Sequence, residues 1–472
     1  LKTIVNEVTT ELYKNASPPP GEQQSGEQQS GEQQSGEQQS YANEEQSDSN
    51  SEKKSENTSN YIFLGFLILL NIMNFVDRQL LASFANFIIP DLGLTNTQFG
   101  LLTGFGFLFF YSIMGLFMGF LADRFDRPKL IAFGVALWSI LTSVSGLAKN
   151  FIGLLIPRMF IGVGESILTP TSLSILGDRF PKERMGFISG AYYLGIPIGA
   201  GLSLIIAGYL GPLIGWRMCF YILGGIGVIF ALIMFFIKDT PRKNIIETNK
   251  KLRFKSVARE LIKALKDSPA LTLCIYGGVV FHFVLGAAVY DQVWYVKERG
   301  FDRAEIAQYT GYIVVVFGIL GNLFGGIGSD LFREKFKLGR PMFLFWLMLF
   351  LLPINILGRL VSPENYIFWF AMMAGSFQLG ALYGPTFSTV QELAPSHMKA
   401  TVIAFLILNI NLIGMFIGTT GTGIIIDALL AYNETATNPI IEPYTKTLLF
   451  FTLISSLSIP MFWLAGKKQK TN

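Results

Sequence analysis

Charged residues are scarce in this chain, and their scarcity excludes an ordinary soluble domain. Asp, Glu, Lys and Arg make up 15% of the 472 residues, whereas 51% are hydrophobic and the mean hydropathy is +0.44. A soluble domain of this length carries about a quarter charged residues. The composition is instead typical of a polytopic membrane protein. The formal net charge of +4 is small, and we expect no nucleic-acid partner.

Cysteine and histidine are also rare, with two of each in the chain. Cys219 and Cys274 both lie in apolar runs, so they provide neither a disulfide framework nor a metal-ligand spacing. The sequence has no HExxH, no GxxxxGK[ST], no GxSxG and no Cys/His cluster. We therefore expect the protein to be no enzyme and to need no metal or cofactor.

Residues 1–59 have little with which to form a core. Four copies of GEQQS run from Gly21 to Ser40, and a stretch rich in Ser, Asn and Glu follows. A segment of this composition buries too little apolar surface to offset the entropy lost on folding. We predict a disordered cytoplasmic tail over residues 1–59.

Long apolar runs dominate the rest of the chain, and a spanning helix needs about 20 mostly apolar residues. The pattern predicts an all-α membrane protein with twelve transmembrane helices, at 60–89, 96–122, 128–148, 150–177, 185–210, 215–237, 269–296, 304–329, 340–360, 364–391, 399–428 and 444–465. The predicted domains are a six-helix bundle at 60–237, a basic cytoplasmic loop at 238–268, a second six-helix bundle at 269–466 and a short basic cytoplasmic tail at 467–472.

Lys and Arg are concentrated in alternate breaks between these helices. They occur near Arg124, near Arg179, in the long central loop and near Arg333, whereas the opposite breaks contain few of them. By the positive-inside rule, both termini face the cytoplasm. We expect a multi-pass protein of the cell membrane, either a plasma or an inner membrane.

The two halves repeat one another. "GFLADRFDRPKL" (119–130) ends the second predicted helix, and "GGIGSDLFREKFKLGR" (325–340) ends the eighth. Each stretch has small residues, then Asp123 or Asp330, then a basic turn. Such repeats are typical of secondary transporters. A carboxylate at a helix end can hold a neighbouring helix N-terminus or an Arg in one state and release it in the other. The alternative is a plain solvated turn.

These stretches resemble motifs of a known family. "GFLADRFDRPKL" resembles the loop motif between the second and third helices of the major facilitator superfamily, and "RMFIGVGES" (158–166) resembles its fourth-helix motif. "NFVDRQLL" (74–81) and "GWR" (215–217) are similar to the spinster-like branch. The resemblance covers residues 60 to 465. It implies two pseudo-symmetric six-helix bundles, a central cavity and alternating access, and it places Gly119, Asp123, Arg124, Arg127 and Asp330 in a gating motif.

Four charges are expected at membrane depth in the first half. Asp77 and Arg78 stand side by side in the first helix, and Arg158 and Glu165 share one face of the fourth, nearly two turns apart. Intramembrane charges are costly and usually mark a pathway. We predict Asp77 and Glu165 as proton-coupling groups and the two arginines as substrate contacts, with deprotonated Asp77 holding an Arg. The alternative is an ion-pair network that only fixes helix packing.

The second half offers weaker candidates for substrate binding. Asp291 occupies the position pseudo-equivalent to Asp77, and Tyr290 precedes it in "VYDQVWY". Tyr383 lies in the tenth helix, where a polar group could line the cavity or merely bridge helices. His282 could titrate near neutrality or simply be a packing residue.

We predict a monomeric secondary active transporter that moves a small amphipathic or anionic organic substrate, lipid-like in the manner of a lysolipid or sphingoid phosphate, with protons as coupling ions. The main alternative is a proton-coupled symporter of small carboxylates, since organic-anion carriers also tend to carry an Asp-Arg pair in the first helix. A sensor built on a transporter fold is the rival from another class.

Overall fold

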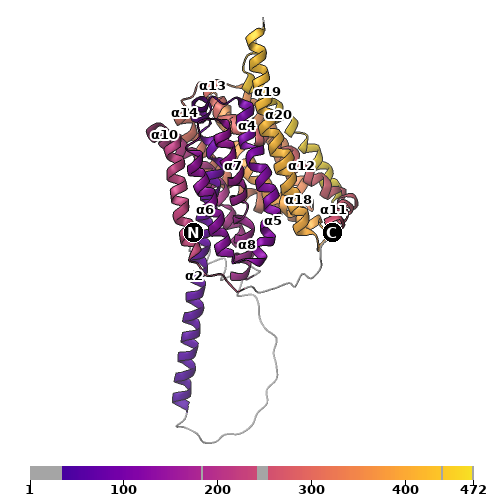
Figure 1. Cartoon of the computed structure of the whole chain (residues 1–472). Helices are drawn as coiled ribbons and strands as arrows, with labels where there is room; N and C mark the ends of the chain where they lie inside the picture. The colour runs from indigo at the N-terminus through magenta and orange to yellow at the C-terminus, as the bar shows by residue number, and fades with distance from the viewer. Residues whose placement is uncertain (1–34, 182–183, 242–253, 437–439, 470–472) are drawn as a thin grey trace. The chain divides into compact units, whose positions relative to one another are not determined.

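The computed structural model describes residues 35–181, 184–241, 254–436 and 440–469, with the side chains of 35–57, 116, 119–120, 123 and 254–256 outside this description. The described residues form helices joined by short turns, and no β-strand occurs among them (Figure 1). Residues 60–472 form one compact unit, separate from residues 1–59.

The helices form an N-terminal half and a C-terminal half, which are joined by a central loop. The N-terminal half contains α2 (Ser35–Ser83), α3 (Ala85–Leu92), α4 (Asn96–Thr103), the π-helix η1 (Phe105–Phe109), α5 (Phe110–Arg124), α6 (Arg127–Ser145), α7 (Phe151–Glu165), α8 (Leu168–Arg179), α9 (Met185–Tyr193) and α10 (Gly195–Phe235). The central loop contains α11 (Phe254–Asp267). The C-terminal half contains α12 (Pro269–Ala287), the 3-10 turn η3 (Ala288–Tyr290), α13 (Asp291–Lys297), α14 (Arg303–Leu323), the π-helix η4 (Phe324–Gly328), α15 (Ser329–Phe336), α16 (Arg340–Leu360), α17 (Tyr366–Leu393), α18 (Lys399–Asn409), the π-helix η5 (Ile410–Met415), α19 (Phe416–Thr435), α20 (Pro443–Ser455) and α21 (Ser458–Lys468).

The prediction of twelve spans is confirmed. Eleven continuous stretches of the described chain are long and apolar enough to cross a membrane. One of them, Met185–Phe235, is 51 residues long and contains a break at Gly215, whose φ of 75° no ordinary helix adopts. Gly211 before this break and Phe220 after it both pack on Phe84, so the chain doubles back there and forms two spans.

Part of the predicted tail is helical, and the disorder predicted for residues 1–59 stays a prediction. Helix α2 begins at Ser35. Extending an existing helix adds one hydrogen bond per residue without a new nucleation cost, and Gln, Glu and Lys are good helix formers. Residues 1–34, with most of the GEQQS repeats, lie outside the described residues.

Helix starts are set by polar caps at the turns. Thr95 and Gln98 form a capping box at α4, Asp126 accepts from the backbone amide of Lys129 at α6, and Ser268 accepts from Leu271 at α12. At α14, the backbone amides of Glu305 and Ala304 hold the pKa of the exposed Asp302 carboxyl below its usual range.

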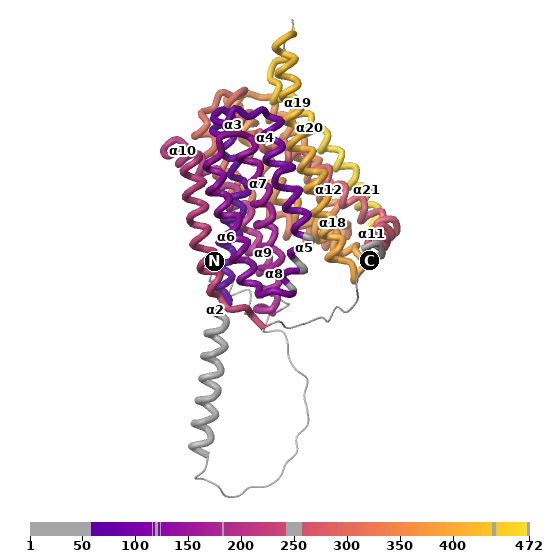
Figure 2. Tube along the Cα trace, viewed as in Figure 1, coloured from indigo at the N-terminus to yellow at the C-terminus, as the bar shows by residue number. Residues whose placement is uncertain are grey.

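Small residues bring matching helices of the two halves together. A Cβ at Gly208 on α10 would lie 2.7 Å from the backbone oxygen of Ala304 on α14, and a Cβ at Gly423 on α19 would lie 2.4 Å from that of Asn96 on α4. The fifth span of the chain (in α10) therefore packs on the eighth (α14), and the eleventh (α19) packs on the second (α4). These two pairs are equivalent when the halves are exchanged, which confirms the pseudo-symmetric halves. Figures 1 and 2 show the spans side by side.

We name the two ends of the helical bundle by their turns. The basic end contains the turns α5–α6 and α15–α16. The far end contains the turns α3–α4 and α13–α14.

Candidate functional site

The four charges predicted at membrane depth lie together inside the N-terminal half. Asp77 and Arg78 project from α2, and Arg158 and Glu165 from α7. The residues Asp77 and Glu165 are only 4% and 1% exposed. The Nε of Arg78 donates to Oε2 of Glu165 at 3.1 Å. Removing one partner of such a buried pair leaves an uncompensated charge, so the pair is both costly to build and costly to break.

The pairing differs from the one predicted from sequence. Asp77 accepts a hydrogen bond from the hydroxyl of Thr142 on α6 at 2.6 Å, and it does not hold an Arg side chain. Arg158 instead donates to the backbone oxygens of Arg78 at 2.7 Å and of Asp77 at 3.5 Å. The reason is geometric: adjacent residues on a helix point about 100° apart, so Asp77 faces α6 while Arg78 faces α7.

Both arginines lie close to the same aromatic ring. The guanidinium carbon of Arg78 lies 5.1 Å from the ring centre of Phe107, and that of Arg158 lies 4.5 Å from it. Arg78 also lies 4.2 Å from the ring centre of Tyr111. Phe107 belongs to the π-helix η1, and π-bulges often occur at functional sites. Cation–π contacts in a desolvated site partly offset the cost of keeping two cations close.

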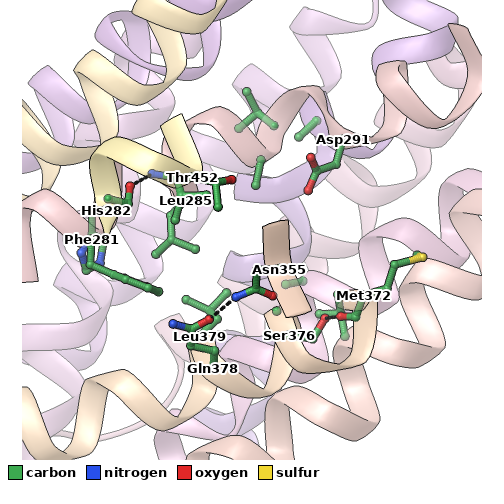
Figure 3. A pocket seen from close by; sticks show the side chains of 18 of the residues that line it. Phe281, His282, Leu285, Asp291, Asn355, Met372, Ser376, Gln378, Leu379 and Thr452 are labelled. Atoms are coloured by element: carbon green, nitrogen blue, oxygen red, sulfur yellow. Dashed lines mark hydrogen bonds between the residues drawn. The ribbon is translucent and has the colours of Figure 1, made fainter. Parts of the chain in front are cut away.

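A cavity of about 430 Å³ lies between the two halves and is lined by both. Arg78 reaches it from α2 with a side chain that is 22% exposed, while Asp291 and Tyr383 reach it from the C-terminal half. Asp77, Glu165, Arg158 and Tyr290 do not line it in this conformation. Most of the lining is apolar, as in Leu285 and Leu379, with a few polar groups at separate points (Figure 3).

Polar groups on the C-terminal wall are already paired with one another. Asp291 accepts from Arg359 on α16 at 2.7 Å, and Asn355 donates to Gln378 at 2.6 Å (Figure 3). His282 contacts the backbone oxygen of Gly278 at 2.6 Å and the hydroxyl of Tyr383 at 3.3 Å. This wall therefore offers dipoles and a neutralised ion pair, so its net charge is small.

Tyr290, predicted as a substrate contact, lies in a different place. Its hydroxyl donates to the backbone oxygen of Asn96 on α4 at 2.6 Å, across the boundary between the halves. Asp427 on α19 accepts at the same point from the backbone amides of Asn96 and Thr97, at 3.0 and 2.7 Å, and from the Asn96 side chain at 2.8 Å. A carboxylate from one half thus caps the first turn of a helix in the other half.

Further contacts join the two halves at the far end. Arg303 donates to the backbone oxygen of Asn86, and Asn86 donates to that of Gln292, again between the halves. The other described hydrogen bonds between the halves lie at the far end or in the middle of the bundle, as between Asn411 and Ser112.

At the basic end, the repeated motif forms one ion-pair cluster in each half. Arg127 is 1% exposed and pairs with Asp178 at 2.5 Å and with Asp239 at 3.0 Å. In the second half, Arg340 pairs with Asp330 at 2.8 Å and with Glu392 at 2.7 Å. Both clusters connect the end of one span to the start of another within the same half.

Arg124, a residue of the predicted gating motif, is exposed at the end of α5. Gly119 and Asp123 lie on α5, but their side chains are outside the described residues, so the gating role of this motif stays a prediction.

Replacing Arg127 by Ala should destabilise the N-terminal half. The change leaves Asp178 and Asp239 without their shared cation, which for a buried pair costs about 3 kcal/mol. Thermal unfolding of the purified protein in detergent measures this. Lys129→Ala is the matched control, because Lys129 is 58% exposed and its contact with Asp126 is long at 3.9 Å. Equal melting temperatures for the two variants would contradict the structural role of Arg127.

Thr142, Arg359 and Asp427 are among the partners that were not predicted from sequence. Asp427 had a visible signal, since it is an acid inside the apolar run "GIIIDALL". Arg359 precedes a predicted turn and resembles an ordinary interfacial cation. Thr142 is one of many hydroxyls on α6, and nothing in its local sequence marks it.

Comparison with known proteins identifies the class. The family model of the Major Facilitator Superfamily matches residues 67–419. The chain is 26% identical over 377 residues to an MFS-type efflux pump of Mycolicibacterium smegmatis, covering 78% of this chain and 84% of that protein. It is 27% identical to a hexuronate transporter of Bacillus subtilis, covering 77% and 87% of the two chains. It is 27% identical to a probable sphingolipid transporter, spinster homolog 1, of Arabidopsis thaliana, covering 57% and 63%.

A solved structure gives the same fold. A bacterial homolog of the human lysosomal transporter Spinster, in an inward-facing and unoccupied conformation, superposes with a TM-score of 0.74 at 23% identity, covering 87% of this chain and 97% of that one. The chain belongs to the Major Facilitator Superfamily, whose members are transporters and not enzymes. The predicted resemblance to the spinster-like branch is confirmed.

Proposed function

We propose that the protein is a proton-coupled carrier of an amphipathic organic anion, lipid-like in character, that works by alternating access. The observation that carries this proposal is the cavity between the halves, in which Arg78 contributes a cation to a mostly apolar lining. A planar guanidinium matches a carboxylate or phosphate with two parallel hydrogen bonds, and the apolar walls suit an alkyl chain. The similarity to a probable sphingolipid transporter supports the lipid-like choice.

The orientation belongs to the same proposal. The basic end faces the cytoplasm, with both termini on that side of the cell membrane, because Lys and Arg are concentrated there. The contacts of Asp427 and Tyr290 then close the outer side. The conformation described is therefore the inward-facing one, and the protein works as a monomer.

Coupling follows from the Arg78–Glu165 pair. When Glu165 takes up a proton, its attraction for Arg78 weakens, and the guanidinium becomes free to bind an anionic headgroup at the cavity wall. Asp77 is the second proton carrier, since it is buried beside Thr142 and next to Arg78 in the chain. The proton on Glu165 and the anionic substrate on Arg78 therefore act on the same ion pair, and this couples their binding.

Proton flux in liposomes tests this proposal. The purified protein is reconstituted with a pH-sensitive dye inside, and lysophospholipids, sphingoid phosphates or small carboxylates are added outside. We expect an amphipathic anion to drive proton movement. Substrate movement without protons would contradict the coupling, and the absence of flux together with measurable binding would favour a sensor on a transporter fold.

A second candidate is a proton-coupled symporter of small carboxylates. The similarity to a hexuronate transporter favours it, as does the pairing of polar groups around Asn355 and Gln378 in the cavity. The same assay separates the two candidates, because a small carboxylate would then drive proton flux while the lysophospholipids would not.

A further inference from the structure

Helix α11 (Phe254–Asp267) is amphipathic, with one side packed on protein and an exposed side that carries both cations and an aliphatic residue. It occupies the central loop between the halves and lies at the periphery of the C-terminal half, beside the start of α12 (Figures 1 and 2). Its apolar side contains Leu261 and Leu265, which pack against the core of that half, and the adjacent Ala264 is buried.

The helix is held at a fixed angle to the bundle. Ser268 ends α11 with a backbone conformation that is not helical, and its side chain caps α12. The hydroxyl of Thr272 on α12 donates to the backbone oxygen of Leu265 at 2.6 Å. Because Pro269 follows directly, α11 cannot continue into α12. The orientation of the sides of α11 is therefore determined by the fold.

The two flanks of α11 are both exposed but differ in chemical character. Glu260 lies 3.7 Å from His397 in the turn between α17 and α18. Ile262 is two residues further on, hence on nearly the opposite flank, and it is 53% exposed. A large, exposed aliphatic side chain at the rim of a membrane domain suits the boundary between headgroups and acyl chains.

The side opposite Leu261 is basic. Arg259, Lys263 and Lys266 are all exposed and recur at spacings of four and three residues, so they share one face next to Ile262. Basic residues beside an apolar flank are the combination that binds anionic lipid surfaces.

We propose that α11 is a docking surface for anionic phospholipids of the leaflet at the basic end, with Ile262 in the acyl boundary and the phosphate groups on Arg259, Lys263 and Lys266. Charge complementarity determines the choice of partner: a face with three cations next to an aliphatic side chain matches a phosphate above a fatty acyl chain. Helix α11 belongs to the loop that connects the two halves, and it packs on the C-terminal half. Lipid binding at α11 would therefore hold this part of the loop at the membrane surface. This inference is independent of the transported substrate.

The first test locates Ile262. The full-length Ile262→Cys protein is labelled with an environment-sensitive fluorophore in nanodiscs that contain nitroxide-bearing lipids, and Glu260→Cys is the matched control on the opposite flank. Cys219 and Cys274 are buried and should not react. We expect lipid quenching at position 262 and little at 260. Quenching at 262 by aqueous iodide but not by the lipids would overturn the proposal.

The second test concerns the charges. Retention of phosphatidylglycerol against phosphatidylcholine is measured by native mass spectrometry for wild type and for Arg259→Gln/Lys263→Gln/Lys266→Gln. We expect the preference for phosphatidylglycerol to fall by roughly fivefold per charge removed. The control removes three exposed cations at the far end, Lys149→Gln/Lys297→Gln/Lys446→Gln, and should keep the preference. An equal fall in both variants, or no fall in the first, would overturn the proposal.

Discussion

Asp77→Asn should reduce proton-driven transport by at least about tenfold, equivalent to about 1.4 kcal/mol in the barrier, while the protein still folds. Asparagine has nearly the same shape, and its oxygen can still accept the hydrogen bond of Thr142 that Asp77 accepts at 2.6 Å. It cannot bind and release a proton at this depth. The change therefore removes one of the two proposed proton carriers and leaves the packing around α2 and α6 in place.

The measurement compares two assays on the same liposomes. Substrate accumulation driven by a proton gradient should be lost, whereas exchange of labelled for unlabelled substrate without a gradient should continue. Thr142→Val is the control, since it removes the hydrogen bond but keeps the carboxylate, and it should retain gradient-driven accumulation. Accumulation by Asp77→Asn that is equal to wild type at every pH would contradict a coupling role for Asp77.

Asp427→Asn should shift the protein away from the conformation described, because it weakens the closure of the far end. The carboxylate accepts three hydrogen bonds from Asn96 and Thr97 of the other half. An amide has one acceptor oxygen, and its NH₂ group would face a backbone N–H. Hydrogen bonds to charged groups contribute about 1.5–3 kcal/mol each, so losing one or two shifts the conformational equilibrium by roughly ten- to a hundredfold.

Distances between spin labels at the far end measure this shift. Leu147 of the N-terminal half and Tyr366 of the C-terminal half are both exposed and are suitable labelling positions. We expect a second, longer distance in Asp427→Asn. Asp302→Asn is the matched control, since Asp302 accepts from two backbone amides of its own half and crosses no boundary. If both variants keep the wild-type distance distribution, Asp427 does not hold the far end closed.

The ion-pair site shows how far sequence reasoning reaches. Asp77, Arg78, Arg158 and Glu165 could be found because charges stand out in apolar runs, and their grouping followed from the antiparallel order of the first and fourth spans. Their pairing could not be predicted. It depends on the rotation of α2 about its own axis, which turns Asp77 toward Thr142 and leaves Glu165 to Arg78.

The predicted substrate contacts divide in the same way. Asp291 and Tyr383 line the cavity together with Arg78, while Tyr290 and Arg158 are turned to backbone oxygens elsewhere. Tyr290 and Asp291 are neighbours in the chain, yet one faces α4 of the other half and the other faces the cavity. Sequence position therefore located the segment, and only the turn at η3 determined which of the two side chains reached the cavity.

The sequence by itself determined the class of protein, the number of spans, their division into two repeated halves and the identity of the buried charges. These follow from the bilayer, where unpaired backbone groups and unpaired charges are so costly that length, hydropathy and isolated ionisable residues carry most of the information. Only the tertiary structure decided at which end the two halves are joined and which partner each charge has. Those outcomes depend on contacts such as Asp427 with Asn96, which are separated by 331 residues and meet only when the two halves pack together.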